Sequence, residues 1–225
     1  MFAHFSWILW NLFLAAIPVA LGYAAAGIGR QITWRRPWLW LALVALLALW
    51  LIFLPNSCYL FTEPRHLFDA MERYGLWTRA RHDPGAAMGL ALRAGVALLY
   101  SSAGALTFAL SIRPIKAWVR SLGFPTAWGV LPFFMLVSLG VYLGLVVRYN
   151  SWDLLTRPGK VLETVAKLTD RPLLVATVVL FGLFLWLAYE VCDIWIDGFA
   201  LRWARWTRRE VKETHPDLRP LAGRR

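Results

Sequence analysis

The sequence predicts an all-α integral membrane protein, a bundle of about five transmembrane helices with interfacial amphipathic helices. Its composition is the first indication. Of the 225 residues, 59% are hydrophobic and 16% are charged, and the mean hydropathy is +0.53, whereas soluble domains carry about 25% charged residues. The second is that the apolar residues form long blocks. Together they exclude a soluble domain, a disordered chain and a disulfide-rich secreted module.

Five blocks approach or exceed the roughly 20 apolar residues that a membrane-spanning helix needs. They cover residues 5–29, 38–54, 86–112, 125–147 and 172–190. None alternates apolar and polar residues as the strands of a membrane β-barrel do, so helices are expected. No lysine or arginine precedes the first block, and the block is too long for a cleavable signal peptide. We therefore expect a transmembrane domain over residues 1–200 and a basic cytoplasmic tail over 201–225.

The charge distribution predicts the orientation. The net charge of +11 would indicate nucleic-acid binding in a soluble protein, but in a membrane protein it reflects basic residues kept on the cytoplasmic side. The first and third loops hold bases without acids, and the C-terminal tail is rich in arginine. The N-terminus is therefore expected outside and the C-terminus inside. Cys58 and Cys192 form no metal-binding or haem-attachment pattern, so the cofactor stays unknown.

A polar motif follows each of the second and fourth predicted spans. The two motifs align at a constant offset, with the matches Asn56/Asn150, Ser57/Ser151, Leu60/Leu154, Thr62/Thr156 and Pro64/Pro158. Each proline is predicted to open an amphipathic helix in the membrane interface. The pattern favours two parallel two-helix repeats followed by a fifth span, and chance similarity is the alternative. In this topology both motifs lie outside.

The two motifs supply a candidate polar site on the outer face. Its members are Asn56, Ser57, Glu63, His66, Asn150, Ser151, Trp152 and Asp153. Carboxylates and a histidine can ligate a cation or act as acid and base, but no strict metal or catalytic spacing is present. No metal is therefore predicted and no catalytic residue is assigned. The structural alternative is that the amides and hydroxyls end helices and that the carboxylates pair with arginines.

Arg93 lies inside the third predicted span. A charge at that depth is costly and is either functional or directed to the interface. We expect it to pair with Asp153 or Glu63 rather than to reach the interface alone.

Acidic residues and then basic ones follow the fifth span. Glu190, Asp193 and Asp197 are spaced to share one helix face, where we expect them to neutralise the arginine-rich tail. The tail from Arg202 to Lys212 has the composition of an amphipathic helix on an anionic leaflet.

The fourth span contains Gly140 and Gly144 in a GxxxG pattern. This pattern favours close helix packing, either within the chain or with a partner subunit.

The two motifs also carry a family resemblance. The first signature runs Phe53-Leu54-Pro55-Asn56-Ser57, Tyr59-Leu60-Phe61-Thr62-Glu63 and His66-Leu67, and the second runs Gly140-Val141-Tyr142-Leu143-Gly144 and Arg148-Tyr149-Asn150-Ser151-Trp152-Asp153. They resemble a bacterial multi-pass membrane family known as domain of unknown function thirteen sixty-one. That family usually has aspartate at the position of Glu63 and apolar residues at Pro64-Arg65. The resemblance implies a multi-pass protein of the bacterial cytoplasmic (inner) membrane and implies no activity.

Three functions remain open, and the chain is not assigned as an enzyme or a non-enzyme. The first is a non-enzymatic membrane subunit or scaffold, favoured by the small size and the absence of a strict catalytic pattern. The second is an enzyme, or a lipid-headgroup or metal-binding protein, with its site on the outer face. The third is a small transporter, although the spans hold few polar residues. Membrane lipids and other membrane subunits are the expected partners, and nucleic acid is not.

Overall fold

The computed structural model describes residues 2–32, 36–62, 64–124, 127–149 and 153–214. Every regular element in these ranges is helical, which confirms the predicted all-α class. The long helices are α1 (Phe2–Gly29), α2 (Pro37–Tyr59), α5 (Pro84–Ser121), α6 (Ala127–Leu145) and α9 (Pro172–Thr214). The short ones are η1 (Leu60–Thr62), α3 (Pro64–Arg73), α4 (Leu76–His82), α7 (Asp153–Thr156) and α8 (Pro158–Thr169).

Four helices, α1, α2, α5 and α9, are long and apolar enough to cross a membrane. The apolar part of α6, Gly129–Leu145, is shorter than the roughly 20 residues of a full span. Large hydrophobic side chains such as Leu41, Leu99 and Leu173 lie exposed on the long helices, as expected where lipid replaces water. The chain is therefore a multi-pass membrane protein, while the number of five spans stays a prediction.

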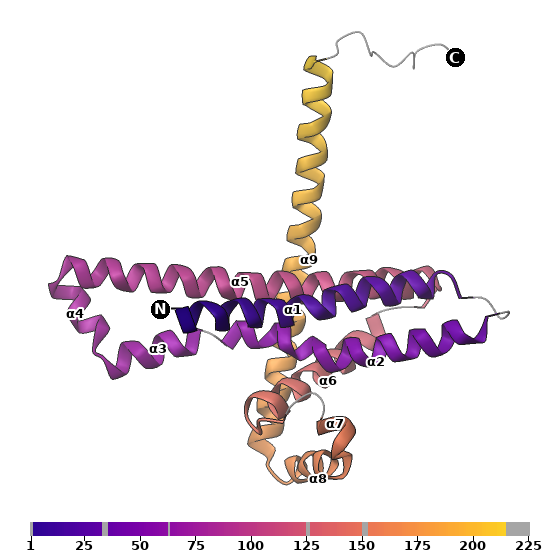
Figure 1. Cartoon of the computed structure of the whole chain (residues 1–225), viewed down its shortest axis with the longest axis horizontal. Helices are drawn as coiled ribbons and strands as arrows, with labels where there is room; N and C mark the ends of the chain where they lie inside the picture. Colours follow the sequence, from indigo (N-terminus) through magenta and orange to yellow (C-terminus); the bar gives the residue numbers. More distant parts are fainter. Residues whose placement is uncertain (1, 33–35, 63, 125–126, 150–152, 215–225) are drawn as a thin grey trace.

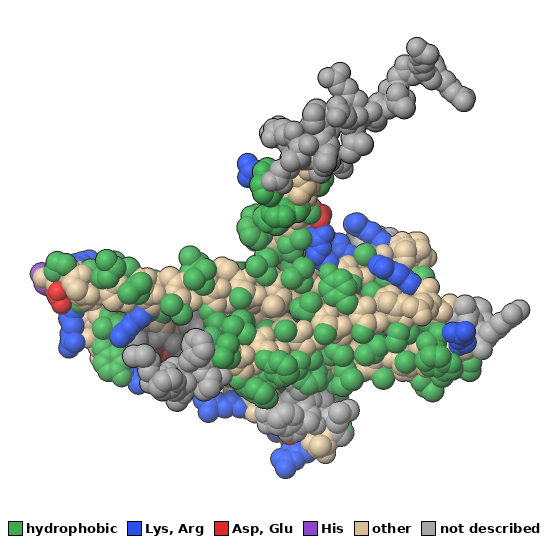
Figure 2. Space-filling model, turned by 45° about the horizontal axis from the view of Figure 1, so that its top comes forward, with side chains coloured by type: hydrophobic (Ala, Val, Ile, Leu, Met, Phe, Trp, Pro, Cys, Tyr) green, Lys and Arg blue, Asp and Glu red, His purple; other side chains and the backbone are tan. Residues whose placement is uncertain are grey.

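Figure 1 shows α1, α2 and α5 side by side in an elongated layer that α9 crosses steeply. The α6 helix packs on α2 and α9. At one end of the layer α3 and α4 pack against α5, whereas α7 and α8 lie at the foot of α9. The C-terminal part of α9 extends beyond the other helices. Figure 2 shows hydrophobic side chains spread over the layer.

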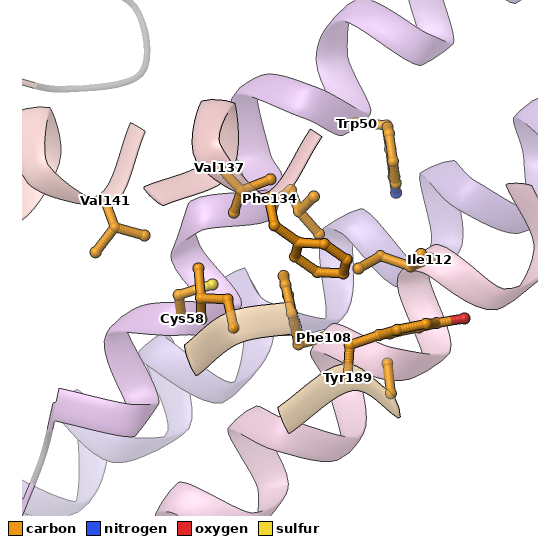
Figure 3. Packing of buried hydrophobic residues seen from close by; sticks show 11 residues of the cluster. Trp50, Cys58, Phe108, Ile112, Phe134, Val137, Val141 and Tyr189 are labelled. Atoms are coloured by element: carbon orange, nitrogen blue, oxygen red, sulfur yellow. The ribbon is translucent and has the colours of Figure 1, made fainter. Parts of the chain in front are cut away.

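The buried core lies where α2, α5, α6 and α9 meet (Figure 3). The ring of Phe134 on α6 lies 6.1 Å from Phe108 on α5 and 5.7 Å from Tyr189 on α9, measured between ring centroids. Trp50 on α2 and Leu185 on α9 belong to the same cluster. Edge-to-face and tilted rings at these distances attract one another beyond their buried area. The cluster therefore fastens the α6–α9 pair to the layer.

Prolines open the helices that follow the loops. The α3 helix begins at Pro64 and α8 begins at Pro158, as predicted. Proline suits this position because the first N–H of a helix has no intrahelical partner. On α8, Val161 and Leu168 are buried, while Lys167 donates to Glu163 at 2.6 Å on the exposed face. This hydrogen bond is the main reason that the pKa of Glu163 is lowered.

Three helices run further than predicted. The predicted ends at residues 54, 112 and 190 correspond to helix ends at Tyr59, Ser121 and Thr214. Asn56 and Ser57 therefore lie in the last turn of α2, which ends at Tyr59, and the helix-termination alternative stays open. Pro55 removes one backbone hydrogen bond from α2, but it lies against α6 at Gly140. Beyond the predicted ends, Ser57 on α2 bonds to α1, and Arg113 and Lys116 on α5 bond to α9.

The packing does not support the predicted duplication. Equivalent repeats would pack α5 on α6 as α1 packs on α2. Instead, α5 joins α1 and α2, whereas α6 makes its main contact with α9. The similarity of the two motifs is thus a matter of sequence and not of equivalent helix pairs.

Candidate functional site

The predicted outer-face residues are only partly described. Glu63, Asn150, Ser151 and Trp152 lie outside the described residues, and His66 lies within α3. Three remain: Asn56 is half-buried near the end of α2, Ser57 is buried beside it, and Asp153 is the first residue of α7. The single pocket expected from the sequence stays a prediction.

Ser57 links α2 to the neighbouring helix α1. Its hydroxyl donates to the carbonyl oxygen of Ala15 at 3.2 Å, and the residue is fully buried. The same part of α2 also meets α5 closely, because a side chain at Gly104 would approach the carbonyl oxygen of Ser57 to 3.1 Å. Ser57 therefore occupies a three-helix contact with no space for a ligand.

We expect Ser57→Ala to lower the free energy of unfolding by about 1 kcal/mol, the typical net contribution of one hydrogen bond. Unfolding of the detergent-solubilised protein with increasing sodium dodecyl sulfate measures this loss. Ser102→Ala is the matched control, because the exposed Ser102 hydroxyl bonds only within α5, to Leu98. Equal stability of the two variants would show that the α1–α2 bond contributes nothing.

The two glycines of the GxxxG pattern line the face of α6 that meets α2. A Cβ atom at Gly140 would lie 2.9 Å from Cγ of Pro55, and one at Gly144 would overlap the hydroxyl of Tyr59. Because both residues are glycines, the C-terminal end of α2 can lie close to the C-terminal end of α6. This contact places the first polar motif beside the helix that leads into the second.

Arg93 is exposed on α5 and forms no ion pair in the part of the chain that the structure describes. The predicted partner Asp153 begins α7, an element that packs on α8. The described residues thus show no Arg93–Asp153 pair, and the other expected partner, Glu63, lies outside them.

The most polar interhelical contact is a charge cluster between α5 and α9, formed by Arg113, Lys116, Tyr189, Glu190, Asp193 and Asp197. Asp193 lies at its centre. Nη1 of Arg113 lies 2.9 Å from Oδ1 of Asp193, and Nζ of Lys116 lies 3.0 Å from Oδ2. The hydroxyl of Tyr189 donates to the same Oδ2 at 3.3 Å. One mostly buried carboxylate thus receives three donors.

Asp197 and Glu190, the outer carboxylates of the cluster, also interact with Arg113 and Lys116. Arg113 also bonds the carbonyl oxygen of Asp193 at 3.1 Å and the carboxylate of Asp197. The Nζ of Lys116 lies 3.6 Å from Glu190 and 4.6 Å from the centroid of the Tyr189 ring. Charges at a membrane boundary are stable only when paired or hydrated. The cluster therefore works as a clamp that fixes where α9 crosses α5.

This arrangement corrects the predicted partner of the acidic stripe. The sequence indicated that Glu190, Asp193 and Asp197 share a face, but the arginine-rich tail was the expected partner. Because α9 continues as a helix, Arg202 lies about 13 Å further along its axis than Asp193, at 1.5 Å per residue. Arg113 and Lys116 were missed, although their spacing of three residues on a helix was a usable signal.

The C-terminal part of α9 carries aromatic residues in helical register. Ring centroids are 6.5 Å apart for Trp195 and Phe199, 6.2 Å for Phe199 and Trp203, and 5.3 Å for Trp203 and Trp206. All four side chains are exposed. We call these four residues the aromatic ladder. It covers one side of the helix where α9 has left the bundle.

The described residues contain no group of three or more His, Cys, Asp or Glu side chains placed to hold a metal ion. Cys58 and Cys192 are both free thiols.

Comparison with known proteins gives one match. The profile of the family described as "Protein of unknown function (DUF1361)" matches residues 10–188. Searches of curated proteins and of solved structures gave no significant match.

Proposed function

Since this chain belongs to the DUF1361 family, whose description assigns no activity, we propose from its geometry that it is a non-enzymatic scaffold subunit of the bacterial inner membrane. Its N-terminus faces outward and its C-terminus lies in the cytoplasm, as the distribution of basic residues indicates. Its role is to hold α9 at a fixed angle so that a partner membrane protein can pack against it.

The observation that carries this proposal is a stripe of exposed leucines on the apolar part of α9. Leu173, Leu180 and Leu187 are 80%, 66% and 61% exposed. They follow one another at intervals of seven residues, so they lie along one side of the helix. A strict seven-residue repeat is the pattern by which one helix packs along another. We call these three residues the leucine stripe.

The charge cluster supports the same function. Its cations and carboxylates bind one another across α5 and α9, so this polar contact serves architecture. Breaking a partly buried pair by removing one member leaves an uncompensated charge. A clamp of this kind gives the leucine stripe a defined direction relative to the layer, which a docking subunit requires.

Photocrosslinking in intact membranes tests the proposal. A photoreactive amino acid at position 180 should give one discrete adduct with another membrane protein, and purification in mild detergent should return that protein in stoichiometric amount. Leu185 is the matched control because it is fully buried on the same helix. The proposal fails if position 180 crosslinks only to lipid, only to a second copy of the chain, or no more than position 185 does.

A further inference from the structure

An apolar notch lies on α9 between residues 194 and 205 and begins beside the charge cluster. Its lining includes Ile194 and Leu201 on one side and Trp195 and Phe199 on the other, with Gly198 at its base. A Cβ atom at Gly198 would meet nothing within 4 Å, so the space above this residue is open. The notch is thus open above Gly198 and is bordered by branched aliphatic groups and flat rings.

Two cations close the C-terminal end of the notch. Arg202 and Arg205 line it, and both are exposed and take part in no ion pair among the residues that the structure describes. At 1.5 Å per residue they lie roughly 6 and 10 Å beyond Gly198 along the helix axis. The apolar space therefore runs directly into a positively charged end.

The charge around this end stays positive. Glu190 and Asp193 precede the notch and Asp197 lies within its sequence range, and all three carboxylates pair with Arg113 or Lys116 on α5. Further along, Arg208, Arg209 and Lys212 outnumber Glu210 and Glu213 in the sequence. An anion at Arg202 and Arg205 would meet little repulsion.

The combination matches one chemistry: a methylene chain joined to an anionic phosphate. We propose that the notch binds an anionic phospholipid, with one acyl chain over Gly198 between Ile194 and Phe199 and the phosphate bound by Arg202 and Arg205. Arginine suits this role because its planar guanidinium donates to two phosphate oxygens at once. The aromatic ladder beside the notch is typical of helices at the membrane interface. This binding does not depend on the proposed partner subunit.

Lipid binding to the full chain in detergent, titrated with phosphatidylglycerol and followed by native mass spectrometry, tests the site. Arg202→Gln/Arg205→Gln should weaken the affinity about fivefold for each arginine removed, as expected for basic residues near an anionic surface. Arg157→Gln/Arg171→Gln removes the same charge from two other exposed arginines and should leave the affinity nearly unchanged. Phosphatidylcholine should bind more weakly because its choline nitrogen balances the phosphate charge, and the Arg202/Arg205 variant should reduce its affinity less than that of phosphatidylglycerol.

The notch is tested separately by Gly198→Leu, which fills it. Loss of contact with about two methylene groups should weaken phosphatidylglycerol binding roughly tenfold, and Gly198→Ala should have a smaller effect. Unfolding does not confound this test, because alanine and leucine favour a helix more than glycine does; circular dichroism checks this.

Each of the following outcomes would overturn the site. The first is equal affinity for phosphatidylglycerol and phosphatidylcholine in the unmodified chain. The second is an Arg202/Arg205 variant that binds like its control, or a Gly198→Leu variant that binds like the unmodified chain. The third is a dimer that Gly198→Leu dissociates in the absence of bound lipid, which would assign the face to a second copy.

Discussion

Asp193→Leu should lower the free energy of unfolding by about 3 kcal/mol, the low end of the loss seen when one partner of a buried ion pair is removed. The carboxylate of Asp193 pairs with Arg113 and Lys116 and accepts a hydrogen bond from Tyr189. Without its carboxylate, two cations and a hydroxyl remain in a poorly hydrated contact between helices. Unfolding of the detergent-solubilised protein with increasing sodium dodecyl sulfate measures the loss.

Asp197→Leu is the matched control for this prediction. It removes the same charge from the same cluster, but the Asp197 side chain is 62% exposed, and exposed pairs contribute about 1 kcal/mol or less.

A second variant separates the effect of lost ion pairing from the effect of lost packing. Arg113→Met/Lys116→Met/Asp193→Leu should recover much of the stability, because apolar residues of similar size can replace a buried ion pair. Equal losses in Asp193→Leu and Asp197→Leu would contradict the central position of Asp193.

The sequence predicted the fold class because lipid imposes simple requirements. A helix in a membrane must be apolar over a defined length, so the positions of α1, α2, α5 and α9 could be predicted from hydrophobicity alone. Prolines 64 and 158 also predicted the starts of α3 and α8. These are local properties, and local patterns are sufficient to indicate them.

The helix ends and helix partners could not be predicted in the same way. Ser57 lies in the last turn of α2, where a polar residue is common, but its hydroxyl donates to the carbonyl oxygen of Ala15 on α1. The sequence places Arg113 at the start of a cytoplasmic loop. In the structure α5 continues past Arg113, and this residue pairs with Asp193 on α9. In each case the partner of the polar group is distant in sequence, so a local pattern could not predict the contact. The leucine stripe, in contrast, is a feature of the sequence itself. The length of an apolar block does not reveal it, whereas the seven-residue spacing of its leucines does.

The largest packing effect is expected at Gly22, where three helices meet. A Cβ atom there would overlap the carbonyl oxygen of Ser111 on α5 and lie 3.3 Å from Nε1 of Trp50 on α2. That same carbonyl oxygen accepts a hydrogen bond from Nε1 of Trp50 at 3.1 Å. Any side chain at Gly22 therefore pushes α1 away from α5 and also disturbs the bond between α5 and α2.

Gly22→Leu should therefore lower the free energy of unfolding by about 3 kcal/mol or more, because overpacking costs roughly 1–3 kcal/mol and the lost hydrogen bond about 1 kcal/mol more. Gly27→Leu is the matched control on the same helix, since a Cβ atom at Gly27 meets nothing within 4 Å. It should be neutral in the same unfolding measurement. Because the obstacle at Gly22 is a backbone atom, Ser111→Ala should fail to restore Gly22→Leu. Restoration would show that the side chains, and not the approach of the α1 and α5 backbones, set this contact.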